Sequence, residues 1–127
     1  MKKIVLLAAV AALAATPALA DVAAQLSVAQ THAGMAAKQA DIKAVQMHLH
    51  HAVNCLVGPS GAGFNAAAGN PCGKAGTGAI PESTDAAQKA KLEAAVTTAT
   101  PGLAATADLA TAQKAAQATA DAVAAAK

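Results

Sequence analysis

The 127-residue sequence is poor in aromatic and charged residues. It contains one Phe and no Tyr, Trp or Arg, and charged residues of all kinds make up 13% of the chain. Stacking on bases requires aromatic rings, and bidentate binding of phosphate requires guanidinium groups. The composition therefore excludes the usual nucleic-acid-binding and phosphoryl-transfer sites, and the length allows one small domain.

The common catalytic motifs are also missing. Two glycine-rich segments, 58–63 and 73–78, superficially resemble phosphate-binding loops, but neither contains the Gly-Lys-Ser or Gly-Lys-Thr that such a loop needs. The seven acidic residues are scattered, so no pair is placed for general acid–base catalysis. We therefore expect a protein that is not an enzyme.

The first 20 residues have the pattern of a cleaved secretory signal peptide. Lys2 and Lys3 precede an apolar run over 4–15, and Ala18 and Ala20 are the small residues that a signal peptidase accepts. The run is too short to span a bilayer as a helix. We predict cleavage after Ala20 and a periplasmic or secreted protein with no membrane anchor. Residues 21–127 then carry seven lysines and seven acids, so the excess positive charge belongs to the leader and does not indicate an acidic partner.

Residues 21–57 have the apolar spacing of one long amphipathic helix, about 21–57, which either runs through or breaks near Gly34. Lys38 falls inside the apolar stripe and weakens it at that turn unless its stem reaches outward. Large apolar residues recur at every seventh position, and three further residues fill the same stripe: Val28, Met35, Ile42, Leu49 and Leu56, with Val45, Ala52 and Val53.

Glycine and proline indicate a long loop over about 58–84, which holds seven of the nine glycines and three of the five prolines. Two more alanine-rich helices follow, at about 85–99 and 101–126. Asp85 and Gln88 have the spacing of a capping box, and Thr100-Pro101 is typical of a helix start. Residues 21–127 are therefore predicted to form a single all-α domain: a small Ala-rich helical hairpin or three-to-four-helix bundle.

The two cysteines, Cys55 and Cys72, lie on either side of the first part of the loop. In a small exported chain such a pair is typical of a disulfide, and closing a loop of this length stabilises a fold by about 3 kcal/mol in the chain-entropy model. The bridge would fold the Gly/Pro-rich loop against the end of the first helix, where Phe64 can cover the core. Neither a zinc-type Cys-x-x-Cys nor a haem-type Cys-x-x-Cys-His is present.

The histidines form the most chemically specific cluster. His48 and His51 are neighbours at i and i+3 on the predicted helix, and Met47 and His51 are neighbours at i and i+4. Imidazole suits Cu, Zn, Ni and Fe, and a thioether adds a preference for Cu(I). We predict that His48, His51 and Met47 form half of a metal site, with His50 and His32 as secondary candidates on the other flank.

A tight metal site needs three or four ligands. The remaining ones would come from His32, Asp41, the glycine-rich loop, a second copy of the chain or an unpaired Cys55. His32 is 16 residues before His48, which is about 24 Å along a straight helix. It can join His50 only if the helix breaks at Gly34 and doubles back.

The leading functional hypothesis is a buffer or carrier of a transition-metal ion, either Cu, Zn or Ni. One alternative is a structural or protein-interaction helical module without metal, which self-associates or binds a partner through the Leu49 apolar face, because heptad spacing is typical of associating helices. A lesser alternative is haem held by histidine without covalent bonds. No nucleic-acid partner is expected.

Overall fold

The computed structural model describes residues 21–127, so the predicted leader and its cleavage site lie outside the described residues. Within this range the fold is an all-α bundle of five helices and one 3-10 turn, with no strands. This confirms the predicted fold class. The elements are α1 (Val22–Ala36), α2 (Ile42–Val57), η1 (Ala66–Ala68), α3 (Ala79–Glu82), α4 (Ala86–Ala104) and α5 (Leu109–Ala125).

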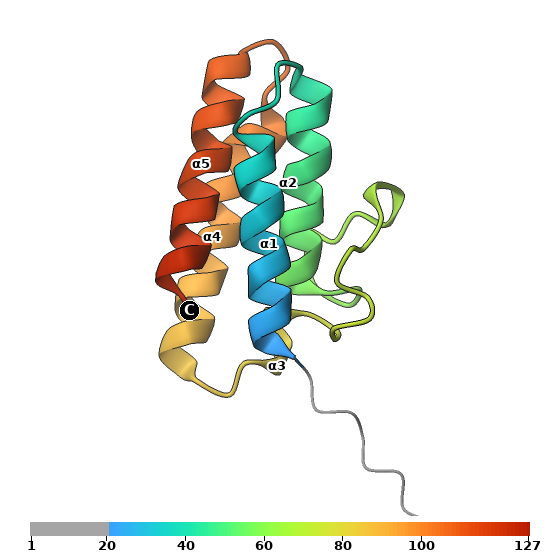
Figure 1. The fold of residues 1–127 in the computed structure, drawn as a ribbon, viewed down its shortest axis with the longest axis vertical. Coiled ribbons are helices and arrows are strands. Elements are labelled where there is room, and N and C mark those ends of the chain that lie inside the picture. Colours follow the sequence, from blue (N-terminus) through green and yellow to red (C-terminus); the bar gives the residue numbers. More distant parts are fainter. Residues whose placement is uncertain (1–20) are drawn as a thin grey trace, which may run out of the picture.

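The four long helices lie side by side along the long axis of the molecule (Figure 1). Helix α1 contacts α2 and α5, and α4 also contacts both α2 and α5, so the four close into a ring around the core. The single-turn α3 packs against α1, α2 and α4 at the end of the bundle where α1 begins. No helix among residues 21–127 has both the length and the hydropathy needed to cross a membrane.

The helix expected over about 21–57 does not run through, and of the two possibilities left open the structure has a break near Gly34. Gly34 itself lies inside α1, and the chain turns back a few residues later, over 37–41. The physical reason is local capping: Asp41 accepts a hydrogen bond from the backbone N–H of Ala44 at 3.1 Å, which starts a new helix. Helices α1 and α2 therefore form an antiparallel hairpin.

The predicted apolar stripe is confirmed on α2 and in part on α1. Val45, Leu49, Ala52, Val53 and Leu56 are buried there, as predicted. On α1 the prediction holds in part: Val28 is partly buried and packs against the core, whereas Met35 is 40% exposed. Lys38 is exposed within that turn. The residues that α1 buries are Gln25, Leu26, Ala29, Ala33 and Ala36.

The predicted break between the last two helices is also misplaced. Helix α4 continues through Pro101 to Ala104, and α5 starts at Leu109. Pro101 has no N–H to donate to the carbonyl of Thr97, so the helix continues through its last turn with one backbone hydrogen bond missing. Gly102 is buried at the same turn, and a Cβ atom added to it would lie 2.6 Å from Leu49 Cδ1. Glycine at this position leaves room for the Leu49 side chain between α4 and α2, and a larger residue would force that side chain to move.

Aspartate starts every long helix. The side chains of Asp21, Asp41, Asp85 and Asp108 each accept a hydrogen bond from a backbone N–H in the first turn of the helix that follows. The Asp85 cap was predicted, and Gln88 N–H is its donor at 2.9 Å. Four of the seven acids are therefore accounted for by helix capping.

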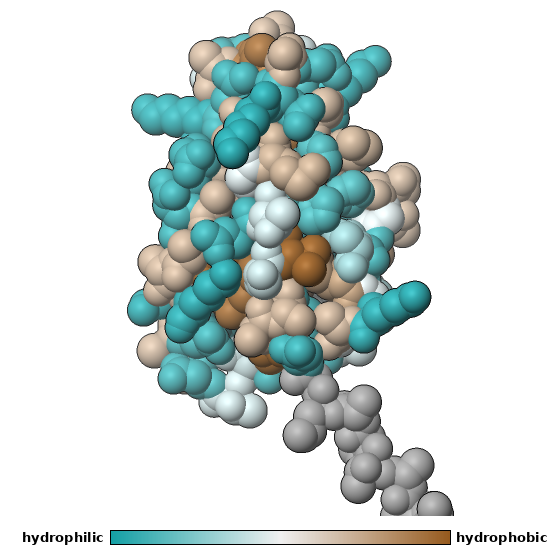
Figure 2. All heavy atoms as spheres, in the orientation of Figure 1, coloured by the Kyte–Doolittle hydropathy of each residue, from teal (hydrophilic) through white to brown (hydrophobic). Residues whose placement is uncertain are grey.

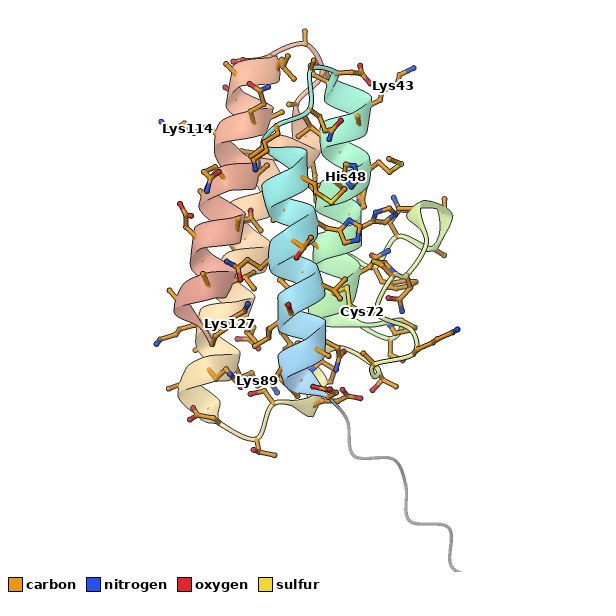
Figure 3. The ribbon with its side chains drawn as sticks, viewed as in Figure 1. Lys43, His48, Cys72, Lys89, Lys114 and Lys127 are labelled. Carbon is orange, nitrogen blue, oxygen red and sulfur yellow. A yellow bond between two sulfur atoms is a disulfide. The ribbon has the colours of Figure 1, made fainter. Side chains whose placement is uncertain are left out.

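The predicted disulfide between Cys55 and Cys72 is present, with both residues buried. It closes the first part of the loop against the last turn of α2, and the loop lies on the outer side of that helix (Figures 1 and 3). Phe64 packs against the core cluster that contains Val53 and Val57, as predicted. The loop contains two elements that the sequence pattern did not indicate, η1 and α3. A buried disulfide fits an oxidising compartment.

Candidate metal centre

Three histidines from two helices converge beside the disulfide-closed loop. His32 comes from α1, and His48 and His51 come from α2. One ring nitrogen from each residue can be chosen so that all three lie within 4.8 Å of one another. The ring centroids are 4.8 to 5.8 Å apart, and all three residues are half-buried. We call these three residues the triad; His48 marks its position in Figure 3.

The antiparallel hairpin explains why these residues meet. His32 and His48 are each eight residues from residue 40, which lies in the connection between α1 and α2. Residues equally far from a tight connection lie at the same level of the two helices. His51 is one turn further along α2, on the same side as His48. Ala33 and Ala52 are buried against each other in one cluster, and their small size lets the two helices approach.

The distance between two of the donor atoms matches a shared ion. Nδ1 of His32 and Nδ1 of His48 are 3.2 Å apart. Two imidazole nitrogens bound to one zinc ion at about 2.0–2.1 Å with tetrahedral angles would be about 3.3 Å apart. Without metal, one of these nitrogens must carry a proton and donate it to the other, because two lone pairs at this distance repel. A metal ion would replace that shared proton.

The hydrogen bond of His51 to the loop leaves its other ring nitrogen with a free lone pair. Its Nε2 lies 2.6 Å from the carbonyl oxygen of Ala68, and a carbonyl oxygen can only accept, so Nε2 carries the proton. Nδ1 of the neutral ring is then an acceptor. It is buried and has no hydrogen-bond partner among the described residues. A buried acceptor without a partner is costly, and a bound cation would remove that cost.

Burial and mutual proximity lower the pKa of His32 and of His48. Desolvation lowers the pKa of His32, and the neighbouring His51 and His48 lower it further. Desolvation also lowers the pKa of His48, with His51 as the second cause. Only a neutral imidazole has a lone pair for a metal ion, so the environment favours the ligand form at neutral pH.

The structure brings together most of the predicted ligands, in a different combination. His48 and His51 lie together, as predicted. On the sequence, His32 could join His50 only if the helix broke at Gly34 and doubled back; the chain does double back, over 37–41, and His32 meets His48 and His51. The turn reverses the chain and so brings His32 of α1 beside His48 of α2.

Two other predicted ligands lie outside the triad. The pKa of His50 is lowered by burial and by the nearby His51, and its Nδ1 is buried without a hydrogen-bond partner in the described range. Its ring does not belong to the converging group. Met47 is 45% exposed on α2, next to His48. The roles of both residues as ligands stay predictions.

Two of the proposed sources of further ligands are used elsewhere. Asp41 caps α2, and Cys55 is bonded to Cys72. The glycine-rich loop contributes to the site indirectly, because the Ala68 carbonyl orients His51. Sequence reasoning did not find this contact, and no motif around Ala68 indicates it. The histidine spacing about residue 40 could have indicated His32, had Asp41 been recognised as a helix cap.

The apolar face predicted for self-association is not available on the surface. Leu49 is fully buried inside the chain, in a cluster with Ala99, Ala112 and Ala116 of the C-terminal helices. Within residues 21–127, the exposed large apolar side chains are Met35 and Met47. Figure 2 shows that hydrophilic side chains and alanines cover most of one face of the bundle, with small hydrophobic patches between them.

Comparison of the chain with protein-family models, with curated proteins and with solved structures finds no match. The function must therefore be inferred from the geometry of the triad.

Proposed function

We propose that this protein binds one transition-metal ion, Cu, Zn or Ni, through His32, His48 and His51, and acts as a periplasmic or secreted buffer or carrier. The observation that carries the proposal is the convergence of three imidazole rings from two helices, with ring nitrogens within 4.8 Å of one another. The Nδ1–Nδ1 distance of 3.2 Å between His32 and His48 is close to the spacing of two ligands on one ion.

The donor set supports a borderline metal ion. Three neutral nitrogen ligands suit Cu, Zn and Ni, whereas Mg and Ca prefer oxygen ligands. Three protein ligands leave a coordination position for water or for a further side chain. Met47, exposed one residue before His48, is the candidate for that position, and its thioether would favour Cu(I).

The accessibility of the triad supports buffering or transport rather than a permanent structural role. All three residues are half-buried, so an ion can reach them without opening the bundle. The core and the disulfide hold the helices together independently of a metal. Because protons compete with metal for the same nitrogens, bound metal is released as the solution becomes acidic.

Converging nitrogens favour a single ion over haem. A haem held by two histidines has them on opposite faces of a wide macrocycle, which must fit between the two rings. The 3.2 Å between the His32 and His48 nitrogens leaves no such space. This distance argues against a haem bound between His32 and His48.

The test is to titrate the purified protein with Zn(II) and with Cu(II). Binding is measured by calorimetry or by competition with a chromophoric chelator. We expect one ion per chain, and we expect His48→Ala/His51→Ala to lose high-affinity binding. His50→Ala is the matched control, because it removes an adjacent imidazole that lies outside the triad. Equal uptake by the double variant and the unaltered protein would contradict the proposal.

Copper(I) titration tests the role of Met47. If the thioether completes the site, Met47→Leu should weaken Cu(I) binding about tenfold or more while leaving Zn(II) affinity nearly unchanged, because thioether sulfur selects the softer ion. Leucine keeps the size and hydrophobicity of the side chain. Unchanged Cu(I) affinity would remove Met47 from the proposed ligand set and leave the triad as the site.

A further inference from the structure

One buried amide on α2 anchors the loop beside the triad. Asn54 is fully buried and is one turn after His51. Its Nδ2 donates to the carbonyl oxygens of Asn65 and Gly69, at 2.8 and 2.7 Å, and its Oδ1 accepts from the backbone N–H of Asn65 at 2.8 Å. Both N–H donors and the oxygen acceptor of this side chain therefore bind the two ends of one loop segment, residues 65–69.

The next residue of α2 provides a second anchor. Cys55 is bonded to Cys72, three residues after Gly69. The segment is thus tied to adjacent positions of the same helix by hydrogen bonds and by a covalent bond. Inside it, the Asn65 side chain accepts hydrogen bonds from Ala67 and Ala68 N–H and so caps the 3-10 turn η1. We call residues 65–72 the latch segment.

Together, the Asn54 hydrogen bonds and the disulfide fix the position of the Ala68 carbonyl group. Ala68 ends η1, and its oxygen accepts from Nε2 of His51 at 2.6 Å. In metal sites, a histidine ligand commonly donates its second ring N–H to such a fixed oxygen, which sets the ring orientation and raises the basicity of the ligand nitrogen. The latch segment supplies such an oxygen to His51, through the Ala68 carbonyl.

From these contacts we infer that Asn54 is a positioning residue of the metal site: by holding the latch segment it places the Ala68 carbonyl on His51 Nε2 and directs Nδ1 of His51 to the ion. This inference rests on the proposed function. It assigns a binding role to a residue that does not touch the ion, and it explains why a fully buried polar side chain lies so close to the triad.

The alternative is that Asn54 only stabilises the loop. The two roles differ in what they predict for the ion. A purely structural Asn54 would affect the free energy of unfolding and leave metal affinity and the bound nitrogen unchanged once the protein is folded. A positioning Asn54 would also change which nitrogen of His51 binds, because without the Ala68 contact the ring is free to rotate and offer Nε2.

The decisive experiment compares Zn(II) affinity in the unaltered protein, in Asn54→Ala and in Gln46→Ala. Gln46 is the matched control, since it is an amide on the same helix that donates to two backbone carbonyls, those of Leu103 and Ala105, away from the triad. We expect Asn54→Ala to lose about 10-fold to 100-fold in affinity, the usual effect of removing an outer-shell partner, and Gln46→Ala to lose almost none. Circular dichroism verifies that each variant is folded.

Nitrogen NMR of protein labelled with 15N-histidine provides the readout that a structural role would not change. Zinc bound to the unaltered protein should shift Nδ1 of His51 and leave Nε2 protonated. In Asn54→Ala we expect a mixture in which Nε2 also binds. Asn65→Ala is a milder second variant, because it removes only the η1 cap in the loop and leaves the Asn54 side chain in place. It should weaken binding several-fold in the same direction.

The outcomes separate the two proposals. If the unaltered protein binds no metal, the proposed function fails and this inference fails with it. If the unaltered protein binds tightly and the folded Asn54→Ala and Asn65→Ala variants bind equally tightly through Nδ1, only the inference about Asn54 is overturned. If Asn54→Ala does not fold, the affinity and binding nitrogen of Asn65→Ala decide between them.

Discussion

The chain contains two helical hairpins that can be compared directly, α1–α2 and α4–α5. Their helices have 15 and 16 residues in the first and 19 and 17 in the second. In each, a short connection ends at an aspartate, Asp41 or Asp108, that caps the returning helix. The same local rules therefore build both halves of the bundle.

The two hairpins differ in what they bury. Small residues dominate the α4–α5 contact, and the buried members there include Ala95, Ala99, Gly102, Ala112 and Ala116. Helix α2 instead contributes four fully buried large side chains, Val45, Leu49, Val53 and Leu56. It also carries the buried amide and the half-cystine that hold the loop.

The side chains and carbonyls that could bind a ligand are concentrated in the α1–α2 half of the bundle. Alanine packing is sufficient to pair helices, and it leaves no polar group that needs a ligand. The loop after α2 supplies backbone carbonyls, and all four histidines of the chain lie on the α1–α2 hairpin. Only that half of the molecule can therefore bind a metal ion through imidazole.

The largest effect on stability should come from the large side chains of α2. Leu49→Ala removes a fully buried leucine from the cluster that joins the two hairpins, so we expect a loss of about 2–5 kcal/mol in the free energy of unfolding. Leu103→Ala on α4 is the control, because Leu103 is only half-buried and should lose less. Urea unfolding of the metal-free proteins measures both. Equal losses would mean that the α2 side chains are not the main support of the core.

The disulfide should have the next largest effect. Cys55→Ala/Cys72→Ala frees a loop whose ends are 17 residues apart in the sequence, so the unfolded chain gains entropy and the free energy of unfolding should fall by about 3 kcal/mol. Because the bridge fixes one end of the latch segment, Zn(II) affinity should fall as well. A loss of stability with unchanged affinity would indicate that the Asn54 hydrogen bonds alone hold the Ala68 carbonyl.

Much of this architecture could be predicted from the sequence. The apolar stripe of α2, the pairing of Cys55 with Cys72 and the proximity of His48 to His51 follow from short-range spacing and from the scarcity of cysteine. These features depend on residues within one helix or on a pair with no competitor. Long-range packing is not needed to derive them.

The rest depended on packing that sequence spacing does not show. The turn at 37–41 contains neither glycine nor proline, and a seven-residue apolar repeat happens to continue across it. Pro101 is a strong breaker signal, but the buried Gly102 packs against Leu49 and the helix continues. The Ala68 carbonyl is placed by backbone geometry in a loop, so no residue type indicates it.

Loss of the Asp41 cap at the connection between α1 and α2 should lower the free energy of unfolding by less than loss of the disulfide. Asp41→Ala removes the side-chain acceptor of Ala44 N–H, and we expect a loss of about 1 kcal/mol in the free energy of unfolding, as is typical of a lost N-cap. Asp41→Asn, which keeps a capping oxygen, should restore most of it. Chemical denaturation measures both variants. No loss in Asp41→Ala would indicate that packing, rather than the cap, fixes where α2 begins.

The smallest predicted effect is a dependence of stability on pH that originates in the α1–α2 hairpin. The folded state lowers the pKa of His32, His48 and His50, mainly by burial, so below the ordinary value of 6.5 the unfolded chain binds more protons than the folded one. The stability of the metal-free protein is therefore complete above about pH 7 and falls as the pH drops through 6.5 toward the lowered values. Partial solvent exposure of the rings keeps this loss small.

Hydrogen exchange of the metal-free protein, measured amide by amide at pH 7.5 and 5.5, tests where this sensitivity lies. After correction for the intrinsic exchange rates, the amides of α1 and α2 around the triad should lose protection at the lower pH before those of α4 and α5. The α4–α5 hairpin has no histidine, so it feels the protonation only through its contacts with the first hairpin. His32→Gln/His48→Gln should remove most of the difference, since glutamine does not titrate. Equal loss of protection in both hairpins, unchanged in that variant, would show that the bundle responds to acid as one unit and that the triad is not its pH-sensitive part.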